Sequence, residues 1–276
     1  GSESTMVGWY AGRYATGSYN TFIGSQAGEG GTTSAPYSSG HSNTSLGYRS
    51  LTAFTTGNQN VALGRDALLS LTTGGDNVAV GTYAGDSLTD NSENTLLGYN
   101  AFSQADSGEG SNVAIGASAG ASINNSSADH NVIVGTSAGT GGSGALSRGV
   151  IIGSHAGNST GTNSVEGMIA IGYNALSGLT SGTGNTAIGY ASGLELTTGT
   201  NNTLLGYYAG SNMDTANTNA VECVYIGSFA GRYMDDGAYN VGIGYQALDG
   251  ASGLGNAGGN NVAIGWSALK AITDGS

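Results

Sequence analysis

The sequence is poor in several residues on which most globular proteins depend. Its 276 residues include one proline and one cysteine, and only 9% are charged, against about a quarter in an ordinary domain. A single cysteine excludes an internal disulfide framework. Apolar runs extend over only a few residues, so none could span a bilayer as a helix. What is abundant is glycine, with 52 residues, and aliphatic residues recur at fixed positions between them. This pattern predicts an ordered repeat rather than a disordered chain.

Basic residues are scarce as well. There are 6 Lys and Arg against 18 Asp and Glu, which gives a formal net charge of −12. A nucleic-acid-binding protein needs a basic surface, and binding to an anionic membrane needs one too. The first class is therefore excluded, and the second is disfavoured. Residues 1–4 read as an expression scar or leader, and residues 5–276 as one repeat domain.

One short unit recurs along the chain. It consists of Asn, Thr or Val, a variable small apolar residue, Ile, Leu or Val, Gly, two variable residues, Ala, and Gly or Leu. Clear copies are NTFIGSQAG (20–28), NVAIGASAG (112–120) and NVAIGWSAL (261–269). Most copies follow one another after 17 to 19 residues. The repeat predicts an all-β protein, a parallel β-solenoid (β-roll) of about fifteen coils. Its structural glycines include Gly24, Gly64, Gly81, Gly116, Gly189, Gly206 and Gly265.

The order of residues within the unit indicates how each strand is buried. The β-branched residue and the aliphatic residue two positions later share one strand face, and we expect this face to be buried in the coil. The residue between them is mostly small and apolar, as in Ala62, Ala114 and Ala187. A strand that is apolar on both faces is expected to be buried twice, the second time against another copy of the chain. A less regular second strand is expected around Phe54 and Leu71 in their coils.

Asparagine begins the strand in eleven copies, from Asn20 to Asn261. Stacked coils would place these amides about 4.8 Å apart, where side-chain amides can form a hydrogen-bonded ladder. Asparagine also tolerates the turn conformation that leads into each strand. The two roles are compatible. Cys223 occupies this place in one copy and is interpreted as a tolerated substitution.

The repeat resembles known surface fibres. The segments NTAIGYASGLELTTGTNNTLLGYYAG (185–210) and NNVAIGWSAL (260–269) are similar to the head repeats of trimeric YadA-like adhesins. They are closer to the NTAIGYxAL repeats of phage tail-fibre proteins. The resemblance covers about residues 5 to 272. It implies a β-roll, assembly as a homotrimer, and a role in attachment.

From this resemblance we expect a segment excised from a longer phage tail fibre of the virion, which contacts a glycan or protein of the host surface. The alternative is the head of a bacterial surface adhesin, which would place the chain on a bacterial cell. The longer coils of this chain make the trimer less secure than the roll. Neither a membrane anchor nor a terminal chaperone domain is recognised.

Aromatic residues are the main candidates for receptor binding, because Tyr and Trp rings can stack on sugar faces. Packing of these rings between coils is the favoured interpretation. The residues that directly follow a motif glycine are Trp9, Tyr48, Tyr99, Tyr173, Tyr190, Tyr207, Tyr245 and Trp266. Two copies also carry Gly-Arg-Tyr, at Arg13-Tyr14 and Arg232-Tyr233. These arginines either pair with local acids or contact a receptor.

Longer intervals between copies predict loops that leave the roll at 29–42, 211–222 and 249–260. Loops on a rigid scaffold commonly carry recognition. Tolerated insertion is an equally good interpretation of these three segments.

Catalysis and metal binding have little support, so we expect no enzyme, no cofactor and no metal. His41, His130 and His155 share no pattern, and metal-ligand spacings are missing. A polysaccharide depolymerase needs paired carboxylates. The candidates Glu109, Asp214 and Asp235-Asp236 lack a second acid in register. Calcium binding by acids in the turns is less expected than a solubilising role for their charge.

An ice-binding solenoid is a further alternative, because such proteins present a flat array of threonines. Thr alternates irregularly with Val at the one regular position, as in Thr95 and Val113. That position is also expected to face the interior. Both observations argue against ice binding.

Overall fold

The structure is a computed structural model of the whole chain. It describes residues 2–31, 37–142, 144–159, 161, 164–213, 220–234, 237–251 and 258–271. The chain divides into two compact units, Gly1–Thr136 and Ser137–Ser276, here called the N-terminal and C-terminal units. Each is described by itself.

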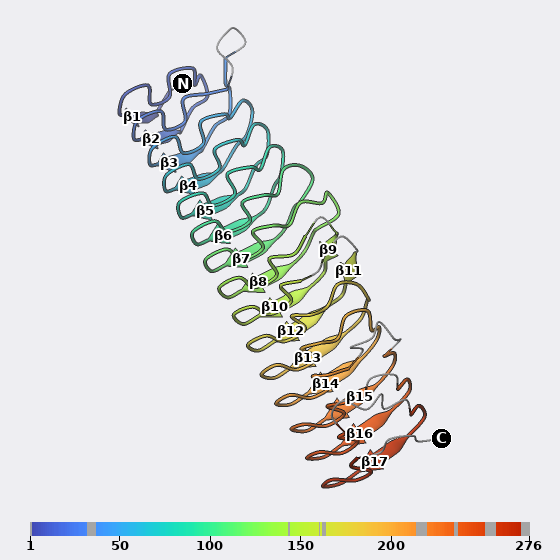
Figure 1. Cartoon of the computed structure of the whole chain (residues 1–276). Coiled ribbons are helices and arrows are strands. Elements are labelled where there is room, and N and C mark those ends of the chain that lie inside the picture. Colours follow the sequence, from blue (N-terminus) through green and yellow to red (C-terminus); the bar gives the residue numbers. More distant parts are fainter. Residues whose placement is uncertain are drawn as a thin grey trace. The chain divides into compact units, whose positions relative to one another are not determined.

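Each copy of the repeat forms one short parallel strand. In the N-terminal unit the strands are β1 (Thr5–Val7), β2 (Thr21–Ile23), β3 (Thr44–Leu46), β4 (Val61–Leu63), β5 (Val78–Val80), β6 (Thr95–Leu97), β7 (Val113–Ile115) and β8 (Val132–Val134). In the C-terminal unit they are β10 (Val150–Ile152), β12 (Ile169–Ile171), β13 (Thr186–Ile188), β14 (Thr203–Leu205), β15 (Val224–Ile226), β16 (Val241–Ile243) and β17 (Val262–Ile264). Within each unit these strands pair in chain order (Figure 1).

The pairing places each motif directly on the next. Val78 is opposite Thr95 in the N-terminal unit, and Thr186 is opposite Thr203 in the C-terminal unit. The strands of the two units enclose about thirteen complete turns, and no helix occurs among the residues described. The predicted parallel β-solenoid is therefore confirmed for each unit, with about thirteen turns rather than fifteen.

The opposite side of each coil differs from the prediction. The apolar residues expected in a second strand, including Phe54 and Leu71, are buried inside the coil but lie in turns and irregular segments. Backbone bonds still connect the coils there, for example from the Leu51 nitrogen to the Ala67 oxygen at 2.9 Å. A second sheet occurs only as the two-residue pair β9 (Leu146–Ser147) and β11 (Val165–Glu166), as far as the described chain shows. Turns suffice because every coil satisfies its backbone through the coils beside it.

The inward and outward faces of the strands are the reverse of the prediction. The middle residue of the strand points into the coil, and Phe22, Ala114 and Leu204 are fully buried. The β-branched residue and the aliphatic residue on either side point outward and are half-buried or exposed. The small-residue position is therefore the core. Six of the fifteen middle residues are Ala, and the others include fully buried side chains as large as Phe22 and Tyr225.

The middle residue and the residue six positions later both lie inside the coil. A β-carbon on Gly28 would lie 2.5 Å from the Phe22 ring, so this coil requires glycine at the later position. In the coil of Ala62, Leu68 stands at the equivalent place and is buried. In these two coils a large residue at one position accompanies a small residue at the other, which keeps the interior closely packed.

Motif glycines that stack on the motif glycine of the next coil have no room for a side chain. Gly116 has a φ of +133°, and a β-carbon on it would lie 2.6 Å from the carbonyl oxygen of Gly135 in the next coil. Only glycine suits both the conformation and the close approach of the two backbones.

The asparagines form the expected ladder inside the coils. The Nδ2 of Asn60 donates to the Oδ1 of Asn43 at 3.1 Å, and the Asn60 backbone nitrogen donates to the same oxygen at 2.9 Å. The Nδ2 of Asn60 also donates to the Gly74 carbonyl of the next coil at 2.9 Å. This amide thus connects the coil before it to the turn of the coil after it. The Nδ2 of Asn77 also donates to the Gly75 oxygen at 3.2 Å, within the turn before its own strand. The ladder and turn roles are both present.

Candidate interaction surfaces

The outward strand face is one candidate surface in each unit. Two columns of side chains line it. One column is β-branched, a mixture of Thr and Val, and the other is aliphatic. In the N-terminal unit Val78, Leu97 and Val132 are more than a third exposed. In the C-terminal unit Ile152 and Leu205 are exposed to a similar degree. A continuous apolar surface of this kind on a protein points to an interaction.

The orientation of this face removes one of the two sequence arguments against ice binding. The Thr and Val column was expected to point inward, and this counted against ice binding. It points outward instead, with Thr44, Thr95 and Thr203 exposed. Its irregular alternation of Thr with Val and Ile still distinguishes it from a uniform threonine array.

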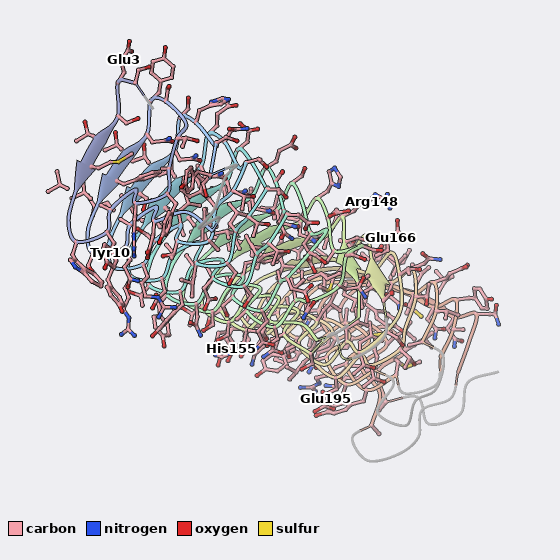
Figure 2. The ribbon with its side chains drawn as sticks, turned by 90° about the horizontal axis from the view of Figure 1, so that it is seen from above. Glu3, Tyr10, Arg148, His155, Glu166 and Glu195 are labelled. Carbon is pink, nitrogen blue, oxygen red and sulfur yellow. The ribbon has the colours of Figure 1, made fainter. Side chains whose placement is uncertain are left out.

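Aromatic residues occupy the edge that follows the motif glycines. In the C-terminal unit Tyr190 stacks on Tyr173, with ring centroids 5.2 Å apart and planes at 19°. It also stacks on Tyr207 at 5.4 Å and 24°. Farther along, Tyr245 and Trp266 lie parallel at 6.4 Å and 14°. Figure 2 shows His155 on the same side of this unit as Glu195, opposite Arg148 and Glu166; His155 contacts the edge of the Tyr173 ring at 6.2 Å.

This arrangement limits what the tyrosines can bind. Tyr190 has another tyrosine ring on each face. A sugar could stack on Tyr190 only if it displaced one of these neighbouring rings. Its exposed part is the ring edge and the hydroxyl group. Trp266 has a ring only on one side among the described residues and is 78% exposed. Packing between coils therefore accounts for the central tyrosines, and a free aromatic face remains at Trp266.

A second row of rings lies beside the first. Tyr208 contacts Tyr190 at 5.5 Å and Tyr207 at 4.7 Å, and Phe229 lies parallel to Tyr208 at 5.9 Å. The pKa of the Tyr208 hydroxyl is raised, first by loss of solvation and then by the neighbouring phenols Tyr190 and Tyr207. The sequence prediction missed this row because its position in the motif is variable.

In the N-terminal unit arginines are interleaved with the aromatics of this edge. The Arg13 guanidinium lies 4.0 Å from the centroid of Tyr10, and Arg49 lies 5.8 Å from that of Tyr48. Trp9 stacks on Tyr10 at 3.7 Å, and Tyr99 contacts the edge of another ring, Tyr83, at 6.1 Å. Exposed Trp, Tyr and Arg are the residues that most often dominate protein interfaces.

The first Gly-Arg-Tyr segment lines a groove of about 370 Å³ formed by Arg13, Tyr14, Ala15, Thr16 and Tyr37. Tyr14 and Tyr37 are nearly parallel, with centroids 6.3 Å apart and planes at 13°. The sequence prediction missed Tyr37, which lies within the predicted loop at 29–42.

Both arginines of the Gly-Arg-Tyr segments pair with an acid of the next coil. This is the first of the two roles that the sequence suggested for them. Arg13 Nη1 lies 3.7 Å from Glu29 Oε1. Arg232 binds both oxygens of the buried Asp249, at 3.0 Å each, and lies over the rings of Phe229 and Tyr233. A bidentate, partly buried pair of this kind fixes the register of two coils. Arg232 is therefore less available for a receptor contact than Arg13 is.

Acidic side chains gather in the turns before β7 and β8. Glu109 is buried, and its Oε2 accepts a hydrogen bond from the Asn91 Nδ2 at 2.7 Å. Its Oε1 has no hydrogen-bond partner among the described residues. Burial raises the pKa of this carboxyl, and hydrogen bonds from the backbone and Asn91 oppose the shift. No group of three or more His, Cys, Asp or Glu suited to a metal occurs within the described ranges.

The remaining predicted candidates fall partly outside the described residues. Asp214 and Asp235-Asp236 lie outside the described residues. So do the central parts of the three predicted loops, residues 32–36, 214–219 and 252–257. Within the part of the chain that is described, no helix is long and apolar enough to cross a membrane.

The geometry defines the class of protein, a parallel β-solenoid with an outward apolar strand face and an aromatic edge. Compared with known proteins, the chain matches no protein-family model and no curated protein.

Proposed function

We propose that the chain is a structural and adhesive segment of a trimeric phage tail fibre, located in the virion. The observation that supports this proposal best is the outward strand face. Its half-exposed aliphatic columns run from strand to strand in each unit, and such a face suits burial against a second and third copy of the same chain. The acidic net charge of −12 is compatible with a solvated outer surface of the assembly.

In this proposal the aromatic edge contacts a host-surface glycan or protein. The groove at Arg13, Tyr14 and Tyr37 offers the exposed Tyr37 ring and a guanidinium group for such a contact. Trp266 offers a second free ring face. Individually weak contacts become effective when three copies bind together. The head of a bacterial surface adhesin would use the same features and remains the alternative.

The first experiment is the solution mass of the chain by light scattering at several concentrations. A mass near three times 27.1 kDa supports the trimeric fibre. A mass of 27.1 kDa at all concentrations contradicts it and leaves the apolar face without its proposed partner. Release of reducing ends from a capsular polysaccharide would instead indicate a depolymerase.

Ice binding is the second candidate function, because the Thr and Val column points outward. A flat face with methyl groups at a regular strand spacing is the feature that this function requires. Thermal hysteresis measured on the monomeric chain tests it. A hysteresis that disappears when exposed threonines such as Thr95 and Thr203 are replaced by lysine would favour this function over the fibre.

A further inference from the structure

The stacked tyrosines of the C-terminal unit form a chain of phenols held at the spacing of the coils. Tyr173, Tyr190 and Tyr207 each follow a motif glycine directly. The strands before them are in register, with Ile171 opposite Ile188 and Ile188 opposite Leu205. Their ring centroids are therefore held 5.2 and 5.4 Å apart.

The same phenols are accessible to solvent. Tyr190 is 44% exposed although both of its ring faces are covered, so its edge and hydroxyl group account for the exposure. The carbons next to the hydroxyl-bearing carbon belong to this edge. These are the positions at which two tyrosyl radicals join.

We propose that Tyr190 with Tyr173 or Tyr207 is an oxidative cross-linking site that joins adjacent coils through a dityrosine bond. A peroxide-driven one-electron oxidant, such as a haem peroxidase, removes one electron and one proton from each phenol. The two phenoxyl radicals couple through a new carbon–carbon bond between their ortho carbons. Each ortho hydrogen then moves to oxygen, which restores both aromatic rings. One hydrogen peroxide takes up the two electrons and two protons and becomes two waters.

The solenoid favours this reaction over coupling between molecules. Two rings held in contact react at a very high effective concentration, because no encounter between chains is needed. The product connects residues one coil apart, which restricts the unfolded chain in the way that a disulfide does. The cross-link would therefore raise the melting temperature of the C-terminal unit and fasten neighbouring coils against a pulling force.

The test treats the full 276-residue chain with a haem peroxidase and hydrogen peroxide. We expect dityrosine fluorescence in a product that still migrates as a single chain on a denaturing gel. Mass spectrometry of a protease digest should find the Tyr190 peptide joined to the Tyr173 or Tyr207 peptide, with the loss of two hydrogen atoms. Because the gel separates chains, this result is independent of whether the protein is a trimer.

Two variants make the test specific. Tyr190→Phe keeps the stacked ring but has no phenol, so fluorescence within the single-chain product should fall, and no cross-linked peptide should contain position 190. Tyr239→Phe is the matched control, because Tyr239 is 52% exposed and contacts no aromatic ring among the described residues. Its fluorescence should equal that of the wild type. Equal loss in both variants, no change in Tyr190→Phe, or cross-links only between chains would overturn the proposal.

Discussion

At the scale of single residues, the motif glycines set the strictest requirement. Gly116→Ala places a methyl group 2.6 Å from the Gly135 oxygen at a φ of +133°. The backbone strain alone costs about 1–3 kcal/mol, and the steric overlap adds about 1–3 kcal/mol. We expect a clearly lower midpoint of urea unfolding, followed by circular dichroism.

Two other glycines allow the stability cost of backbone strain to be measured without the cost of steric overlap. Gly265 has a φ of +125° and Gly167 a φ of +67°, and no atom lies within 4 Å of a β-carbon placed on either. Gly265→Ala and the internal Gly167→Ala should show the strain alone. If all three variants lose the same stability, the contact between stacked glycine backbones is not what requires glycine.

Glu109 is a residue whose charge should make stability depend on pH. Its folded pKa is raised above 4.5 by burial, so the folded chain binds more protons than the unfolded chain between 4.5 and that raised value. The free energy of unfolding therefore falls as the pH rises through this window. Glu109→Gln removes the dependence and should stabilise the protein at neutral pH by about 1–3 kcal/mol.

The measurement is denaturant unfolding at pH 4 and pH 7. The gain in Glu109→Gln should be present at pH 7 and absent at pH 4. Glu93→Gln, which changes an exposed carboxyl of the same turn region, is the control and should change little. A variant that is less stable than the wild type at pH 7 would show that the Glu109 charge is compensated inside the coil.

At the scale of the coil, the sequence predicted the strand but not its orientation. An alternation with a period of two indicates that neighbouring side chains point to opposite faces of the strand. It does not indicate which face lies inside the coil. The β-branched and aliphatic residues are larger and more regular, and the prediction placed them in the core for this reason. The interior instead takes the middle residue, which ranges in size from Ala62 to Phe22. The residue six positions later gives no regular signal of this, because Ala62 stands with Leu68 whereas Ala79 stands with Gly85.

The turn side of the coil was predicted less well for a related reason. Hydrophobic residues such as Phe54 and Leu71 correctly marked buried positions. Burial in a solenoid does not require a strand, because bonds between successive coils satisfy the backbone of turns as well. The two-ring contact at Tyr14 and Tyr37 could not be predicted, since it joins a regular coil to an insertion without repeat character.

One of the interruptions of the asparagine ladder, at Cys223, can be repaired. The Cys223 backbone nitrogen donates to Asn202 Oδ1 at 3.0 Å, and its thiol donates to the Gly237 oxygen at 3.0 Å. Cys223→Asn would restore an amide between Asn202 and Asn240, both fully buried. We expect a gain of about 0.5–1.5 kcal/mol from the added hydrogen bonds.

Thermal unfolding of the variant checks this expectation. Cys223→Ala, which removes the thiol contact and adds no amide, serves as the control and should lower the melting temperature slightly. A lower melting temperature in Cys223→Asn than in Cys223→Ala would mean that the lumen at Tyr225, which fills this coil, leaves no space for the larger side chain.

At the scale of the whole molecule, the apolar strand face needs a partner more than any other part of the surface. The sequence indicated that both strand faces are apolar and that one of them would meet another copy. The reversal of the faces makes this expectation more specific, because the surface available for association consists of the larger Val, Ile and Leu side chains. These bury more apolar area per strand than alanines would.

Charges introduced on this face should prevent association without disturbing the fold. Val113 and Ile115 are half-buried on the outward face of β7, so Val113→Glu with Ile115→Glu adds two carboxylates where a neighbouring chain would be packed. Burying these charges costs several kcal/mol each, and we expect the mass by light scattering to fall to 27.1 kDa. Gln104→Glu with Asn124→Glu adds the same charge to exposed turns and should leave a trimer intact. If the strand variant remains a trimer, the chains associate through another surface, and the aromatic edge becomes the next region to test, because its rings would then be buried between copies.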